Sequence, residues 1–239
     1  MRRFVTIGAL ILFTANLVQA GEETGFISKL YKGPEGDGKY VVYVPRNYKG
    51  DKEFPLILFL HGSGETGTDG EAQAKQGLGN AIKKMKEDFS FIAVFPQSQK
   101  RTWKADSDDA KRALAILDEV QKSYKVDAKR IYLTGLSMGG FGTWSLAAAF
   151  PERWAAIAPI CGGGNPSTAE KIKNVPCWCF HGDADKAVKV EQSRSMIEAL
   201  KKAGASPRYT EYEGVGHNSW DRAYGTAELY EWFLMHKLK

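Results

Sequence analysis

The chain has 239 residues, of which 43% are hydrophobic and 12% aromatic, and this is sufficient for one substantial core within a single domain. Its 33 basic and 28 acidic side chains give a net charge of +5, and the lysines are scattered rather than clustered, so we expect no nucleic-acid partner. Three cysteines are too few for a disulfide framework, and at least one of them must be unpaired.

The first twenty residues have the pattern of a secretory signal peptide. Two arginines precede an uncharged apolar run over residues 4–18, and the small residue Ala20 comes before a polar stretch. The run is short for a bilayer span, and no second stretch of this kind follows. We therefore predict a signal peptide over residues 1–20 and one catalytic domain over residues 21–239. The protein is then expected to be secreted or periplasmic, without a membrane span after cleavage.

Beyond residue 25, short apolar runs alternate with longer amphipathic ones, which indicates βαβ units and a mostly parallel sheet. The clearest helix follows Ser107, a residue suited to N-capping, and another ends before Gly204, as a C-cap glycine requires. We predict an α/β fold with an eight-stranded sheet and helices on both faces. The predicted strands span residues 25–31, 40–44, 55–60, 91–95, 130–133, 155–160, 176–180 and 208–212, and the predicted helices residues 80–85, 107–120, 138–150, 190–202 and 224–238.

In sheets of this kind, the chemistry collects where the strands end. The carboxyl ends of parallel strands meet at one edge, and ligands bind in the crevice outside that edge. Polar residues of the kinds used in catalysis should therefore come directly after the apolar runs. They do so at His61, Ser137, Asp183, Asp185 and His217.

A G-x-S-x-G motif surrounds Ser137. It reads Gly135-Leu136-Ser137-Met138-Gly139, with a predicted strand before it and a predicted helix after it. This is the setting of a nucleophile elbow, in which the two glycines allow strand and helix to approach closely around an exposed serine. The motif therefore predicts that Ser137 is a catalytic nucleophile.

A serine nucleophile needs a histidine base, which is itself oriented by a carboxylate. Of the four histidines, His217 lies in a glycine-rich loop after the last predicted strand, so we predict that it is the base. The acid should come from the loop after the preceding strand, where both Asp183 and Asp185 occur. Spacing favours Asp185, 48 residues after Ser137 and 32 before His217, and we expect Asp183 to bond loop amides in an Asx-type turn.

An oxyanion hole needs two backbone N–H donors directed at one oxygen. One should be the amide of Met138, directly after the nucleophile. The other should come from the glycine-rich loop over residues 61–67, with Ser63 as first choice and Gly64 as second. We expect no cofactor and no metal. Cys177, Cys179 and His181 alternate along one predicted strand and could in principle hold a metal, but small core residues are the stronger interpretation.

Four motifs together, "LHGSGETG", "GLSMGG", "HGDADKAV" and "GHNSW", resemble the α/β-hydrolase superfamily from about Tyr40 to the C-terminus. They look like its lidless branch, which holds phospholipase/carboxylesterases, dienelactone-hydrolase-like proteins and secreted feruloyl or acetylxylan esterase domains. The chain is also similar to predicted peptidases of the prolyl oligopeptidase group. The resemblance implies Asp185 rather than Asp183 as the acid and Ser63 as the oxyanion donor. The nucleophile is a serine, whereas true dienelactone hydrolases have a cysteine.

The predicted site should be open. Only about a dozen residues separate Cys161 from the strand near Pro176, which leaves no room for a helical cap. An open cleft suits small soluble esters or the exposed esters of a polymer, and Trp103 and Trp220 are predicted to bind the substrate. Our first hypothesis is a secreted serine carboxylesterase that acts through an acyl-enzyme, on acetyl or feruloyl esters of polysaccharide. A peptidase with the same triad and a non-catalytic binding protein are the alternatives.

Overall fold

The computed structural model describes residues 23–85 and 88–239. The signal peptide predicted over residues 1–20 lies outside the described residues. Within them, no helix has both the length and the apolar character needed to cross a membrane.

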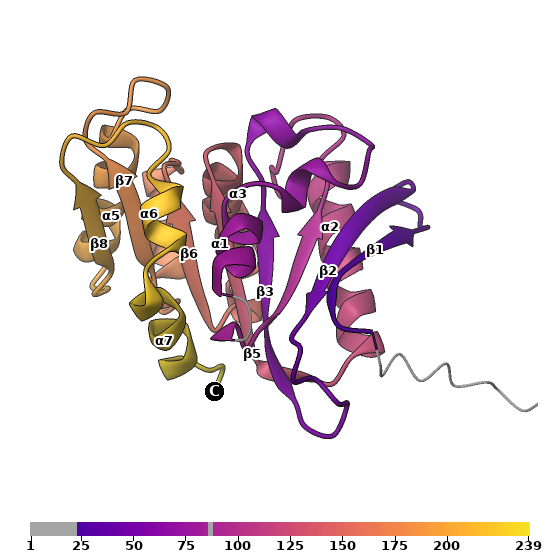
Figure 1. Cartoon of the computed structure of the whole chain (residues 1–239). Helices are drawn as coiled ribbons and strands as arrows, with labels where there is room; N and C mark the ends of the chain where they lie inside the picture. The colour runs from indigo at the N-terminus through magenta and orange to yellow at the C-terminus, as the bar shows by residue number, and fades with distance from the viewer. Residues whose placement is uncertain (1–22, 86–87) are drawn as a thin grey trace, which may run out of the picture.

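One eight-stranded sheet runs through the described chain, as predicted (Figure 1). Its strand order is β1-β2-β4-β3-β5-β6-β7-β8. The strands from β4 to β8 pair in parallel, and only β1 and β2 run antiparallel to their neighbours. The strands are β1 (Gly25–Tyr31), β2 (Gly38–Val44), β3 (Phe54–Leu60), β4 (Ile92–Pro96), β5 (Val126–Leu136), β6 (Ala156–Ile160), β7 (Trp178–Gly182) and β8 (Arg208–Tyr212).

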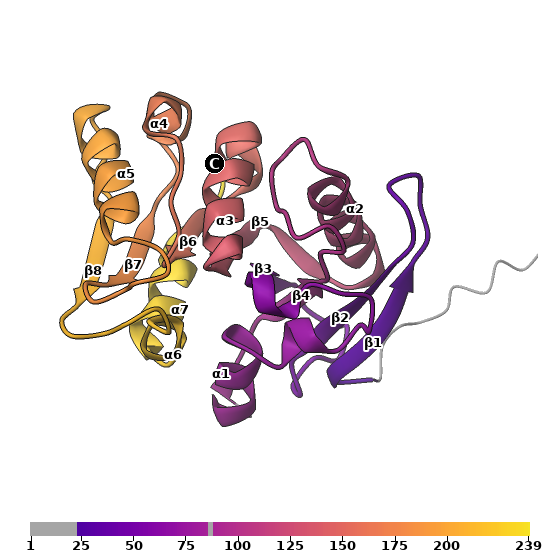
Figure 2. The same cartoon turned by 90° about the horizontal axis from the view of Figure 1, so that it is seen from above.

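Helices cover both faces of the sheet, which is also as predicted (Figure 2). Residues of α2, α3, α4 and α5 join one buried hydrophobic cluster, and residues of α1, α6 and α7 join a second cluster. The sheet is therefore buried on both sides, which explains the near-continuous apolar runs of its central strands. The helices are α1 (Leu78–Met85), α2 (Asp108–Ser123), α3 (Met138–Ala149), α4 (Ala169–Ile172), α5 (Glu191–Lys202), α6 (Trp220–Tyr224) and α7 (Ala227–Met235).

Two elements differ from the sequence prediction. Strand β5 begins four residues earlier than expected, because its first residues are polar and partly exposed and so lack an apolar signal. The single helix predicted over residues 224–238 is instead two helices, α6 and α7. The amide of Gly225 bonds back to Asp221 and ends α6, and the extended backbone of Thr226 separates it from α7.

The segment between β6 and β7 packs into the helix layer. It contains η5 (Pro166–Thr168) and α4, and Ala169 and Ile172 of α4 are buried in the first hydrophobic cluster. A segment whose apolar side chains are spent on this core does not form a cap over the ends of the strands. The loops that follow β3, β5, β7 and β8 therefore meet at an uncovered edge of the sheet.

Candidate active site

Ser137 lies at a sharp turn between β5 and α3. Its φ of 53° and ψ of −116° are strained for a residue with a side chain, and strain of this kind clusters at functional sites. The turn depends on Gly135 and Gly139. A Cβ atom at Gly139 would lie 1.9 Å from the Leu60 carbonyl oxygen, and one at Gly135 would lie 2.4 Å from the Gly139 oxygen. The two glycines are therefore required for the close approach of helix and strand.

Ser137, His217 and Asp185 form a continuous chain of hydrogen bonds. The Oγ of Ser137 lies 2.9 Å from Nε2 of His217, and Nδ1 of His217 lies 2.7 Å from Oδ2 of Asp185. A carboxylate only accepts, so Nδ1 carries the proton and Nε2 accepts from the serine hydroxyl. The Asp185 side chain is fully buried, and that of His217 is 28% exposed. Three loops that are distant in sequence thus place a nucleophile, a base and a carboxylate in line.

The carboxylate of Asp185 is held by its own loop. Its Oδ1 accepts hydrogen bonds from the amides of Ala187 at 2.8 Å and Val188 at 2.9 Å. Burial by itself raises the pKa of Asp185, but the hydrogen bonds from His217 and from the two amides outweigh it. The pKa therefore lies below its usual value, and the group is ionised at neutral pH.

Asp183, the alternative acid, is directed elsewhere. It is exposed, and its Oδ1 accepts a hydrogen bond from the amide of Gly214 at 2.7 Å. The prediction of an Asx-type turn at Asp183 is wrong, because Gly214 lies in the loop after β8 and the local turn is formed by Asp185. Asp183 instead joins the loop after β7 to the loop that carries His217.

A second histidine supports the acid. Nε2 of His181, at the end of β7, lies 2.9 Å from the Val188 carbonyl oxygen and 3.2 Å from Oδ2 of Asp185. Its Nδ1 lies 2.7 Å from the Ser193 hydroxyl. Both of these oxygens facing Nε2 can only accept, so Nε2 must carry a proton. His181 therefore fixes the loop between β7 and α5. The sequence showed only that it ends a strand.

Two backbone amides near Ser137 lack partners within their own helices. Met138 is the first residue of α3, and Ser63 is the first residue of the 3-10 helix η1 (Ser63–Glu65), with Gly64 next in the same turn. First-turn N–H groups have no intrahelical acceptor. Leu60 at the end of β3 pairs with Gly135 of β5, so η1 begins beside the nucleophile turn. These are the amides predicted for the oxyanion hole.

His61 and Trp103 fix the start of the η1 loop. Nδ1 of His61 lies 2.6 Å from the Gly62 carbonyl oxygen, and its Nε2 accepts a hydrogen bond from the Ser98 amide at 2.9 Å. Burial lowers the pKa of His61 to about 4, so the ring is neutral at pH 7. The indole N–H of Trp103 donates to the His61 carbonyl oxygen at 3.0 Å.

The sequence model of the dienelactone hydrolase family matches residues 37–223, more than three quarters of the chain. The chain belongs to this family. It is 28% identical over 207 residues to a bifunctional acetylxylan esterase/xylanase from Neocallimastix patriciarum, an alignment that covers 84% of this chain and 29% of that protein. It is also 27% identical over 211 residues to a probable feruloyl esterase C from Aspergillus flavus, covering 86% of this chain and 76% of that one.

Solved structures resemble this family member as well. The crystal structure of a thermostable esterase matches with a TM-score of 0.78 and 33% identity, over 89% of this chain and 63% of that chain. A feruloyl esterase module from Clostridium thermocellum, complexed with sinapinate, has a TM-score of 0.68 at 18% identity and shows the shared fold, over 87% of this chain and 86% of that one. The chain spans less than two thirds of the acetylxylan esterase/xylanase and of the thermostable esterase. The family and these relatives indicate a serine carboxylic ester hydrolase of the α/β-hydrolase fold.

The nucleophile of this dienelactone hydrolase family member opens into a pocket of about 380 Å³. Trp103 lines the pocket, although it is only 2% exposed. Trp220 is the first residue of α6 rather than part of a loop; it packs edge-on against His217 with ring centroids 5.3 Å apart and is not among the residues that line this pocket. The full lining is Arg101, Thr102, Trp103, Lys104, Ser137, Met138, Phe141, Gly142 and Ser145.

Sequence reasoning missed Phe141, Arg101 and Lys104. Phe141 is 39% exposed and lies one helical turn after Ser137, and this spacing of four residues places both on one helix face. That spacing was a usable signal. Arg101 and Lys104 come from the loop between β4 and α2, whose position beside the nucleophile depends on the tertiary fold.

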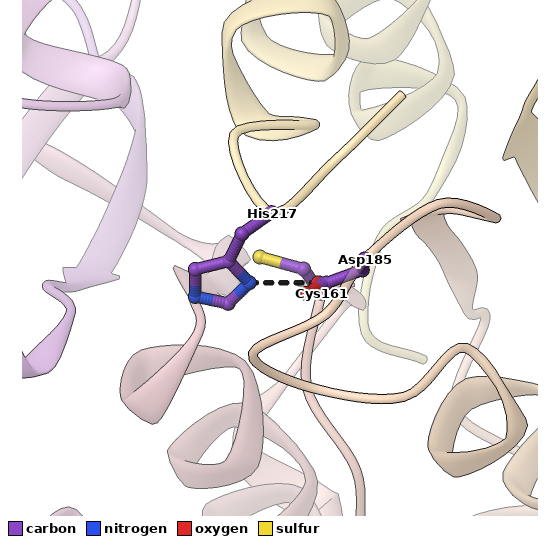
Figure 3. Close-up of side chains that lie close together, drawn as sticks. All are labelled: Cys161, Asp185 and His217. Atoms are coloured by element: carbon purple, nitrogen blue, oxygen red, sulfur yellow. Dashed lines mark hydrogen bonds and ion pairs between the residues drawn. The ribbon is translucent and has the colours of Figure 1, made fainter. Parts of the chain in front are cut away.

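Cys161 lies next to the acid and the base, as Figure 3 shows. One potential ligand atom from each of Cys161, Asp185 and His217 lies within 4.8 Å of the others. Burial raises the pKa of the Cys161 thiol to about 12, so the sulfur stays protonated and is a poor metal ligand. The other two side chains are already bonded to each other, so this donor set does not suit a resident metal. Cys177 and Cys179 are, like Cys161, free buried thiols.

Proposed function

We propose that this protein hydrolyses carboxylic esters through an acyl-enzyme formed on Ser137. The observation that carries the proposal is the pair of hydrogen bonds from Ser137 to His217 and from His217 to Asp185. A binding protein on the same fold would not need all three side chains in this alignment. We further propose residues 21–239 as a single catalytic domain exported with the help of residues 1–20.

In this mechanism, His217 takes the proton of Ser137 through Nε2 as the serine oxygen attacks the ester carbonyl carbon. The carbonyl oxygen becomes an oxyanion, which the amides of Met138 and Ser63 stabilise. The imidazolium, held by the Asp185 carboxylate, then gives its proton to the departing alcohol. Water, deprotonated by His217, attacks the acyl-enzyme in the second half of the cycle and releases the acid. Asp185 remains ionised throughout.

We propose acetyl or feruloyl esters of polysaccharides as the substrates. The names of the acetylxylan and feruloyl esterases among the relatives support this class. The open edge of the sheet also supports it, because the segment between β6 and β7 packs into the helix layer and does not cover Ser137. An ester group on a bulky polymer can reach a nucleophile that is exposed in this way.

The test uses the chain without residues 1–20 and a fluorophosphonate probe, with the labelled peptide mapped by mass spectrometry. We expect the label on Ser137, and a loss of 4-nitrophenyl acetate hydrolysis of at least about 10⁴-fold in Ser137→Ala. Ser145→Ala is the matched control, because Ser145 lines the same pocket and its Oγ already accepts the Ala105 amide. Label on another residue, or unchanged hydrolysis in folded Ser137→Ala, would overturn the proposal.

Acetylated xylan, methyl ferulate and a 4-nitroanilide then compare acetyl ester, feruloyl ester and amide. We expect turnover of at least one of the two esters and a much lower rate on the amide. Faster cleavage of the amide would favour a peptidase over the esterase proposed here.

A further inference from the structure

The pocket at Ser137 continues into a second hollow along α3. The second hollow has a volume of about 440 Å³ and reaches Gly163, Asn165 and Lys171. Lys104, Phe141 and Ser145 line both hollows. We call this joint depression the α3 groove. It extends well past the reacting ester, so it has room for part of the substrate that is not cleaved.

The α3 groove is lined by cations without acidic partners. Arg101, Lys104 and Lys171 line it, and no aspartate or glutamate does so among the described residues. In this part of the chain, none of the three cations forms an ion pair, whereas two lysines just outside the groove do. Lys100 lies 2.8 Å from Asp108, and Lys173 pairs with Glu170. The lysines outside the groove are thus neutralised locally, and the cations that line it remain free to attract an anion.

The loop that carries Arg101 is firmly built. Arg101 has a φ of 56°, an uncommon conformation for a residue with a side chain. On one side of it, the buried carboxylate of Asp109 accepts hydrogen bonds from the Ser98 hydroxyl at 2.6 Å and the Lys100 amide at 2.7 Å. On the other side, the Thr102 amide donates to Ser98 Oγ at 3.1 Å. The strained conformation is therefore held in place by its neighbours, as is usual where strain serves a function.

An aromatic side chain stands between the two hollows. Phe141 lines both of them and is 39% exposed, which is unusual for a residue of its size. An exposed ring beside free cations offers two kinds of contact to one ligand. The apolar face of a sugar ring can pack on the aromatic ring, and the cations can pair with charges on neighbouring sugars.

We propose that the α3 groove binds an anionic glycan, a chain of sugars with carboxylate substituents, that carries the ester cleaved at Ser137. This inference rests on the proposed esterase function and specifies its substrate. The guanidinium of Arg101 can bind one carboxylate in a bidentate manner, and Lys104 and Lys171 add charge farther along the groove. Such charges raise the local concentration of an anionic substrate, and salt screens the effect.

The test compares two matched substrates. One is acetylated xylo-oligosaccharides with glucuronic acid substituents; the other is the same material with its carboxyl groups reduced to alcohols and its acetyl groups restored. We expect kcat/KM for acetate release to be about tenfold higher on the acidic substrate, which corresponds to about 1.4 kcal/mol. The ratio should fall as salt rises from 20 to 500 mM, values chosen to shorten the Debye length several-fold.

Variants identify the groove as the source of this preference. In Lys104→Gln combined with Lys171→Gln, the ratio between the two substrates should fall from about ten to about two. Lys201→Gln, on the exposed end of α5 and outside the groove, should keep the ratio of the unmodified protein. Equal kcat/KM on both substrates, or an unchanged ratio in the double variant, would refute the anionic-glycan inference.

Hydrolysis of neutral 4-nitrophenyl acetate by the unmodified protein separates the two proposals. If this hydrolysis depends on Ser137 but the acidic substrate has no advantage, only the inference about the groove is refuted. If no ester is hydrolysed in a Ser137-dependent manner, the esterase proposal is refuted, and the inference with it.

Discussion

Replacing Asp185 with asparagine tests the catalytic assignment without changing the shape of the side chain. The amide oxygen can keep the hydrogen bonds from Ala187 and Val188, which measure 2.8 and 2.9 Å in the native loop. The amide nitrogen must then take the position of Oδ2. Because the loop retains these bonds, we expect the fold to be preserved and the effect to be confined to the histidine.

The effect on His217 is a change of tautomer. A nitrogen donor 2.7 Å from Nδ1 cannot accept the Nδ1 proton, so the ring is stable only with its proton on Nε2, facing Ser137. In that form, it cannot take the serine proton. In a serine protease, the same change lowers kcat by about 10⁴-fold, and we expect a similar loss here, equal to about 5.5 kcal/mol of transition-state stabilisation.

The assay is steady-state hydrolysis of 4-nitrophenyl acetate, with circular dichroism and thermal unfolding to verify the fold. Asp183→Asn is the matched control. Its single bond to the Gly214 amide can be kept by the asparagine oxygen, so we expect kcat/KM within about threefold of the unmodified protein. If Asp183→Asn loses as much activity as Asp185→Asn, or if Asp185→Asn keeps a tenth of its activity, the assignment of the acid is incorrect.

Three further predictions concern the structure around the nucleophile. Burial holds the pKa of His61 at about 4 against 6.5 for a free imidazole, so between these values the unfolded chain binds a proton that the folded chain does not. Stability should therefore be complete above about pH 6.5 and fall by about 3 kcal/mol towards pH 4, and urea titrations of His61→Gln should lack this component. Gly139→Ala should lower the free energy of unfolding by at least about 2 kcal/mol, because its Cβ would lie 1.9 Å from the Leu60 oxygen; Gly64→Ala, with no atom within 4 Å, should be close to neutral in the same titration. Trp103→Phe leaves the His61 carbonyl oxygen without its donor, so urea unfolding should show a loss of about 1–3 kcal/mol, and no loss would mean that this bond does not hold the loop.

Much of the fold could be predicted because its signals are local. Most of the strands begin and end within two residues of the expected positions, since a sheet buried on both faces produces apolar runs bounded by turn residues. The order of Ser137, Asp185 and His217 could also be predicted, because each follows a strand of a parallel sheet. The early start of β5 and the division between α6 and α7 could not, since a strand edge paired by polar residues and a break at Gly225 have no apolar pattern.

Two of the four histidines show where sequence reasoning ends. His61 and His181 both follow or end strands, as a catalytic base would, yet each is buried and uses both ring nitrogens within the protein. His217 differs in one respect: its Nε2 faces only the serine hydroxyl, and its side chain is partly exposed. A base must have one nitrogen available for the reaction, and a structural histidine has none. That distinction depends on partners from other loops, so it becomes visible only when the loops are placed together. The same reasoning applies to the cations of the α3 groove, which are distinguished from other surface lysines by the carboxylates that they lack.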